Sequence, residues 1–198
     1  LGDVYKRQII NGDKLTGLTF MKMEKGLDTG PIYRQDNIKI DHEETSGSLE
    51  KKMSKVSSSK IVEGIDSIEE NKMTLISQNN ESATYAPKIS REETKINWSM
   101  KATAIANLIN GLSPSPAAYG LLNKQRINFY LAEAVEKESL GPGKIVEVSK
   151  NNNILTIPKS YSQSSNNYVW PTTYSTAHVD VEQKQINSGW KQYQYHYQ

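Results

Sequence analysis

The spacing of apolar residues changes once along this chain of 198 residues, and that change limits the folds it can adopt. Before Gly111, apolar residues in two long segments recur every three or four positions, as they do in amphipathic helices. After Gly111, apolar and polar residues alternate in short runs, which is the pattern of strands. The sequence therefore predicts a mixed α/β N-terminal region and a β-rich C-terminal region.

Two segments are expected to form helices, one on either side of a polar linker. The first covers about residues 46–70, with Thr45 or Ser46 as its N-cap and Asn71 at its end. Its apolar side would cover one face of a sheet. The second is expected to begin after Ser99, whose hydroxyl would cap it, and Gly111 followed by Pro114 is expected to stop it.

Four short segments beyond the second helix have strand character, at 119–122, 126–134, 143–148 and 154–157. Short runs of Asn, Lys, Gly and Pro separate them, as expected for turns. A set of short strands with tight turns suits a small barrel.

A tight turn bracketed by two glycines carries the carboxylate of Asp28, and strand-like segments at 17–23 and 32–40 flank this turn. We expect the two segments to pair through it. Gly26 and Gly30 would permit positive φ and a close approach of the backbone by a ligand. A catalytic role for Asp28 competes with a structural one, in which its side chain hydrogen-bonds the backbone of its own turn.

Seven short motifs stand in an order and spacing that carry a family resemblance. In the N-terminal region they are Ile10–Asp13, Thr16–Met23, Gly26–Pro31 and Glu44–Leu49. In the C-terminal region they are Ser82–Ile89, Ile96–Ser99 and Pro114–Tyr119. Together they cover about residues 9–157 and resemble the methionyl-tRNA formyltransferase family, from the later half of its catalytic domain onward.

The resemblance implies a division of the chain into domains. Residues 1–77 would be the C-terminal part of a Rossmann-like α/β formyltransferase domain, which is incomplete here. Residues 78–95 would be an interdomain linker, and residues 96–157 a small OB-like β-barrel domain.

The resemblance also implies an activity and a site. In that family a formyl group passes from 10-formyltetrahydrofolate to the amino group of the methionine on initiator tRNA. The family's catalytic aspartate corresponds to Asp28, which would orient a histidine, and its folate-binding turn corresponds to Gly26, Leu27, Thr29 and Gly30. The family's asparagine and histidine have no counterpart in matching context, so we expect a fragment that is inactive alone.

Initiator methionyl-tRNA is the partner that the resemblance implies. The net charge of +2 is too small to indicate nucleic-acid binding, so tRNA would need local clusters of basic residues. Each basic residue, taken singly, is more typical of a solvated surface. The candidates along the linker and the C-terminal domain are Lys88, Arg91, Lys95, Lys101, Lys124 and Arg126.

The composition excludes several kinds of site. Without cysteine the chain has no disulfide and no thiolate nucleophile, and no Cys/His spacing suggests a metal centre. No apolar run is long enough to span a bilayer, and no leader opens the chain, so we expect a cytoplasmic protein with no membrane partner. A monomer is the expected oligomeric state. His42 lies in a polar loop and is expected to be solvated.

The two ends of the chain depart from the resemblance. Residues 1–8 match neither the family pattern nor the period of a helix or strand, so the chain is expected to begin in mid-domain. Residues 158–198 are rich in aromatic residues and poor in aliphatic ones, and could be a divergent tail, a disordered tail or a frame-shifted one. A frame shift is favoured, because the stretch also lacks the charge typical of disorder.

Two other functions remain open. The linker and barrel could act as a non-catalytic tRNA-binding module, or the aspartate turn could belong to another folate-dependent formyltransferase. Those other enzymes usually lack the second domain, so the motifs at 96–119 favour the tRNA enzyme.

Overall fold

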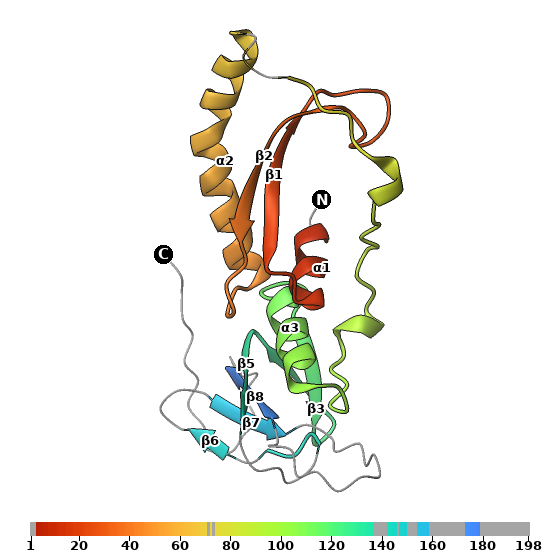
Figure 1. Cartoon of the computed structure of the whole chain (residues 1–198). Coiled ribbons are helices and arrows are strands. Elements are labelled where there is room, and N and C mark those ends of the chain that lie inside the picture. The colour runs from red at the N-terminus through yellow and green to blue at the C-terminus, as the bar shows by residue number, and fades with distance from the viewer. Residues whose placement is uncertain are drawn as a thin grey trace, which may run out of the picture.

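The computed structural model describes residues 3–70, 72, 74–136, 142–145, 147–149, 154–158 and 173–178 (Figure 1). The helices are α1 Val4–Asn11, α2 Ser46–Glu69 and α3 Ala102–Leu112, with two 3₁₀ turns at Asn80–Ser82 and Glu92–Thr94. The strands are β1 Leu15–Met21, β2 Ile32–Lys39, β3 Ala118–Leu122, β4 Gln125–Phe129, β5 Leu131–Glu136, β6 Glu147–Ser149, β7 Ile154–Pro158 and β8 Thr173–His178. This arrangement confirms the expected mixed α/β fold.

The hairpin of β1 and β2 is the sheet of the N-terminal region. The strands are antiparallel, with Leu15 opposite Lys39 at the base and Met21 opposite Ile32 beside the turn, so the predicted pairing through the Asp28 turn is confirmed. Ile76 hydrogen-bonds Ile32 in both directions, which extends the sheet by one bridge.

Helix α2 runs along the hairpin and is capped as the sequence predicted (Figure 1). The Thr45 hydroxyl accepts a hydrogen bond from the backbone N–H of Ser48, and the Ser48 hydroxyl accepts one from Thr45 N–H. Leu49, near the start of the helix, is fully buried against Ile38 and Ile40. The helix ends with Glu70 at the C-cap, and Asn71 lies outside the described residues.

Residues 4–11 form helix α1, which the sequence did not predict. Gly12 ends the helix in the left-handed conformation at φ 80°, and its N–H bonds the carbonyls of Gln8 and Ile9. Polar side chains that hid a helical period have partners outside the helix: Gln8 accepts a hydrogen bond from Thr16, and Arg7 donates to Glu93. Tertiary contacts therefore stabilise a helix that eight residues would not form alone.

Helix α3 is the centre of the larger apolar cluster, in which Ile105, Ile109 and Leu112 are almost completely buried. The expected cap was wrong. Lys101 takes the N-cap position in an extended conformation, because a local turn from Asn97 to Met100 separates Ser99 from the helix.

Helix α3 also joins the N-terminal region to the C-terminal strands. One side packs against α1 so closely that a Cβ on Gly111 would lie 2.6 Å from Ile10 Cγ1 and 3.0 Å from the Lys6 carbonyl oxygen. On another side, the amide of Asn110 exchanges two hydrogen bonds of 2.9 Å with the backbone of Ala132 in β5. The helix continues through Gly111 because the glycine serves this contact.

The C-terminal strands form two sheets, β3-β4 and β5-β8-β7-β6. The expected strand at 126–134 is divided at Tyr130, and of the described residues within 143–148, Glu147 and Val148 belong to a strand. The described pairings do not close a barrel, so the OB-like barrel stays a prediction. In the stretch after Pro158, β8 pairs with β5 and β7, while residues 159–172 and 179–198 lie outside the described part.

We predict opposite effects from alanine at two helical glycines. Gly111→Ala should lower the free energy of unfolding by about 1 to 2 kcal/mol, because its methyl group would meet Ile10 and the α1 backbone. Gly64→Ala in α2 should be neutral or stabilising by up to about 1 kcal/mol, since its nearest neighbour is Phe20 at 3.5 Å. Urea unfolding measures both, and a shift of the same sign and size in the two variants would contradict the account.

Candidate active site

The Asp28 turn is held together by its own backbone. Lys22 N–H donates to the Pro31 carbonyl at 2.9 Å, which closes the loop. Asp28 is the residue with positive φ, at 54°, a conformation that aspartate tolerates better than most side chains. The expectation that Gly26 and Gly30 supply positive φ was wrong.

Gly26 and Gly30 are needed because a side chain at either position would not fit in the turn. A Cβ on Gly30 would lie 1.7 Å from the Lys22 carbonyl oxygen, so only glycine lets the two sides of the loop approach each other. A Cβ on Gly26 would lie 2.2 Å from the Thr29 hydroxyl oxygen. The close approach that these two glycines allow is therefore between parts of the protein's own chain.

Gln78 clamps the turn from the linker, and sequence reasoning missed it. Its Nε2 donates to the carbonyl of Asp28 at 2.9 Å and to the carbonyl of Gly30 at 2.6 Å. The two carbonyls lie 50 and 48 residues away from it in sequence. No local pattern distinguishes this glutamine from the polar residues around it.

The Asp28 carboxylate itself is exposed and takes no part in the turn's hydrogen bonds within the described residues. The alternative of a side chain that stabilises its own turn is therefore wrong. Asp28 lies at a shallow pocket of about 210 Å³, beside the exposed side chains of Met23 and Leu27. The other residues that line the pocket are Met21, Glu24, Lys25 and Gly26.

The pocket includes only part of the expected folate turn. Gly26 and Leu27 line it together with Asp28, whereas Thr29 and the buried Gly30 do not. The folate-binding assignment of these four residues stays a prediction. An open pocket lined by apolar side chains and by the carboxylates of Asp28 and Glu24 can hold a flat, partly apolar ligand and can accept or orient a proton.

His42 lies at the opposite end of the hairpin from Asp28. Strand β2 separates them, and its eight residues span about 25 Å. The side chain of His42 is exposed, as expected. No histidine lines the pocket, and within the described residues no group of three His, Cys, Asp or Glu side chains could hold a metal ion.

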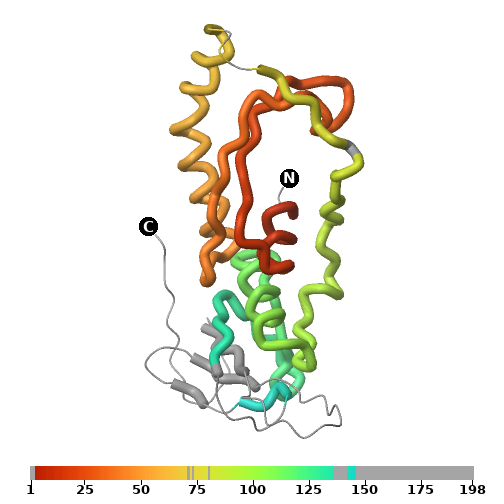
Figure 2. The backbone as a smooth tube through the Cα atoms, viewed as in Figure 1, coloured from red at the N-terminus to blue at the C-terminus, as the bar shows by residue number. Residues whose placement is uncertain are grey.

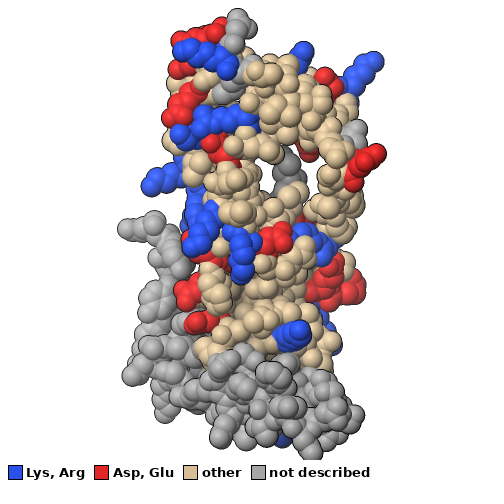
Figure 3. Space-filling model, in the orientation of Figure 1, with Lys and Arg blue, Asp and Glu red and all other residues tan. Residues whose placement is uncertain are grey.

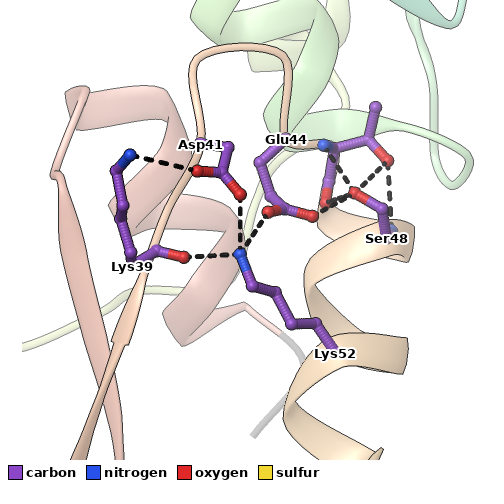
Figure 4. A network of polar contacts seen from close by, with 6 residues as sticks. Lys39, Asp41, Glu44, Ser48 and Lys52 are labelled. Atoms are coloured by element: carbon purple, nitrogen blue, oxygen red, sulfur yellow. Dashed lines mark hydrogen bonds and ion pairs between the residues drawn. The ribbon is translucent and has the colours of Figure 1, made fainter.

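The loop that contains His42 is fixed by a polar network around Lys52 (Figure 4). The Lys52 ammonium donates to Asp41 Oδ2 at 2.8 Å, Glu44 Oε2 at 3.0 Å and the Lys39 carbonyl at 2.7 Å. Its hydrogen bond to Asp41 lowers the pKa of that carboxyl. Since Lys39, Asp41, Glu44 and Lys52 all have partners within this network, the network is structural.

The six cationic candidates are all exposed, but they lie in separate places. Arg126 stacks on the Tyr119 ring at 4.1 Å, and a backbone bridge places Lys95 beside the same tyrosine. Lys124 lies in the tight turn between β3 and β4. The others are Lys101 before α3 and Lys88 and Arg91 in the linker.

The face that Figure 3 shows carries no single basic surface. Lys and Arg side chains there alternate with Asp and Glu (Figure 3). The structure therefore supports two small groups of cations, one on the β3-β4 hairpin and one on the linker, and their role in tRNA binding stays a prediction.

Two family models match the chain. The one described as "Formyl transferase" matches residues 2–65, and the one described as "Formyl transferase, C-terminal domain" matches residues 88–158. The chain belongs to the formyl transferase family. The first match also corrects the expectation that residues 1–8 lie outside the family pattern.

A sequence relative narrows the resemblance. The methionyl-tRNA formyltransferase of Thermodesulfovibrio yellowstonii is 39% identical over 147 residues, which are 74% of this chain and 47% of that protein. The resemblance to methionyl-tRNA formyltransferases is thus confirmed. The chain spans about half the length of the curated relatives it matches.

Solved structures share the fold. HypX from Aquifex aeolicus in complex with tetrahydrofolic acid has a TM-score of 0.64 at 13% identity, over 92% of this chain and 30% of that one. The methionyl-tRNA formyltransferase from Clostridium thermocellum has a TM-score of 0.52 at 20% identity, over 65% of this chain and 55% of that one.

Among the described residues, no helix is long and apolar enough to cross a membrane.

We predict that Gln78→Ala loosens the Asp28 turn. Loss of the two side-chain hydrogen bonds should increase amide hydrogen exchange within residues 26–31 by about fivefold to tenfold. Asn79→Ala is the matched control, because Asn79 bonds only Glu81 and Ser82 within the linker. Equal exchange in the two variants would show that Gln78 does not hold the turn.

Proposed function

We propose that this chain serves the transfer of a formyl group from 10-formyltetrahydrofolate to the methionine amino group of initiator methionyl-tRNA. The observation that carries the proposal is the free Asp28 carboxylate on a clamped turn beside an open pocket. The family matches on both sides of the linker support it. The relatives' substrate suggests the acceptor, and a neighbour solved with tetrahydrofolic acid suggests the donor class.

The chemistry defines what Asp28 would do. The methionine nitrogen attacks the formyl carbon, a tetrahedral oxyanion forms, and the bond from that carbon to N10 of the folate then breaks. The attacking nitrogen loses a proton, and N10 gains one. Asp28 would orient a histidine that accepts the proton and would stabilise its charged form.

Asp28 cannot do this work alone. A carboxylate accepts hydrogen bonds, whereas a developing oxyanion needs donors. Among the described residues no histidine lines the pocket, so in this proposal the partner histidine and the oxyanion donors come from residues outside this chain. We further propose a monomer that acts in the cytoplasm, where initiator tRNA is charged and used.

The exposed cations suggest how tRNA would be held. Lys88 and Arg91 on the linker and Lys124 and Arg126 on the β3-β4 hairpin would contact phosphates, which gives affinity that depends on salt but not on sequence. A non-catalytic tRNA-binding module is the second candidate, because these cations need no part of the Asp28 pocket. Binding without transfer, in a protein completed as described below, would favour it.

The test uses a chimera in which the upstream residues of the Thermodesulfovibrio yellowstonii relative precede this chain. Asp28→Asn should lower kcat for formyl transfer by about two orders of magnitude or more, as expected for loss of an orienting carboxylate, and leave the unfolding midpoint unchanged. Asp13→Asn, at another exposed aspartate, is the control and should retain activity. Near-normal kcat in the Asp28→Asn chimera would refute the catalytic role.

A further inference from the structure

All three guanidinium nitrogens of Arg7, a residue of α1, donate hydrogen bonds to the linker. Its Nε donates to the Pro87 carbonyl at 3.0 Å and its Nη2 to the Lys88 carbonyl at 3.3 Å. Nη1 and Nη2 grip the two carboxylate oxygens of Glu93, with Nη2 to Oε1 at 3.0 Å. One side chain thus holds both ends of the segment 87–93, which lies 80 to 86 residues away in sequence.

Two further contacts hold the same segment. The Glu93 carboxylate accepts a hydrogen bond from Ser90 N–H at 2.9 Å, and the Asp3 carboxylate accepts one from Ile89 N–H at 3.3 Å. The hydrogen bonds from Arg7 and Ser90 lower the pKa of Glu93 to about 2, so the ion pair stays charged at neutral pH. Side chains of Asp3, of α1 and of the segment itself therefore supply hydrogen bonds that this backbone would otherwise form within a sheet.

Of the four charged residues in the segment, Glu93 is paired with Arg7, whereas Lys88, Arg91 and Glu92 are exposed. Arg7 and Glu93 neutralise each other, and the Arg7 side chain is only 19% exposed. The side chains of Lys88 and Arg91 are exposed and form no ion pair within the described part of the chain. The segment runs along the outside of the molecule between the hairpin turn and α3 (Figure 2). Its two free cations are thus held on a fixed backbone and face solvent.

We propose that Arg7 is a positioning residue that docks the segment 87–93 on α1 and so presents Lys88 and Arg91 together to an RNA phosphate backbone. The choice of RNA as ligand rests on the proposed function. The docking itself rests on the contacts of Arg7, Glu93 and Asp3, and not on any function of the protein. A docked linker has already lost the conformational freedom that a flexible one would lose on binding RNA, which strengthens binding.

The test uses the 198-residue chain with Arg7→Gln and Glu93→Gln, each of which removes the ion pair. Trypsin cleavage after Lys88 and Arg91 reports whether the segment is docked, and a titration with deacylated initiator tRNA at low salt reports affinity. Both variants should be cleaved about tenfold faster and bind tRNA several-fold more weakly. Arg34→Gln, which removes the ion pairs with Asp36 of the hairpin and Glu63 of α2, is the control and should change neither measurement.

Glu93→Gln gives the decisive result. Removal of a negative charge should strengthen RNA binding if charge alone matters, but weaken it if Glu93 acts through Arg7 and the linker. Unchanged or tighter binding, or unchanged cleavage, overturns the proposal. If Arg7→Gln does not fold, Glu93→Gln still decides it. If the unaltered chain shows no salt-sensitive tRNA binding, the RNA role of Arg7 and the tRNA part of the proposed function both fall, while the cleavage rates still show whether Arg7 docks the linker.

Discussion

The contact between α1 and α3 at Gly111 is the constraint on which the rest of the structure depends. A side chain at this position would overlap Ile10 and the backbone of α1, so glycine is what lets the two helices touch. A second junction lies nearby, where Ser46 and Gly47 at the start of α2 both donate hydrogen bonds to the Ser113 carbonyl. Through these contacts the hairpin that carries Asp28 and the C-terminal strands share one support.

The same constraint explains why the linker can be ordered. Because α1 is held against α3, Arg7 on α1 stands at a fixed place beside the linker and can bind both ends of the segment 87–93. At the other end of the linker, the Gln78 side chain hydrogen-bonds the Asp28 turn and so fixes that end. The linker therefore connects the candidate active site to the C-terminal region through two side-chain clamps, each of which joins residues remote in sequence.

Sequence reasoning succeeded where the information is local. The hairpin follows from two runs of strand character around a glycine-bracketed turn, and the Thr45 cap of α2 follows from the order of residues at the helix start. It failed where the information is tertiary. The helical period of α1 is hidden by polar residues whose partners lie outside the helix, and Ser99 has the chemistry of a cap but lies within a separate turn. The role of Gln78 depends on carbonyls about 50 residues away.

The candidate site, too, could be predicted from the sequence only where the information is local. Asp28 could be selected from its motif, but its positive φ, its exposure and its freedom from hydrogen bonds in the turn come from the structure. The most direct measurement compares the 198-residue chain with the chimera, each incubated with 10-formyltetrahydrofolate and methionyl-tRNA and analysed for formylmethionine. The account predicts product from the chimera and none above background from the chain alone, since Asp28 can orient a base but cannot stabilise an oxyanion. Turnover by the chain alone would contradict it.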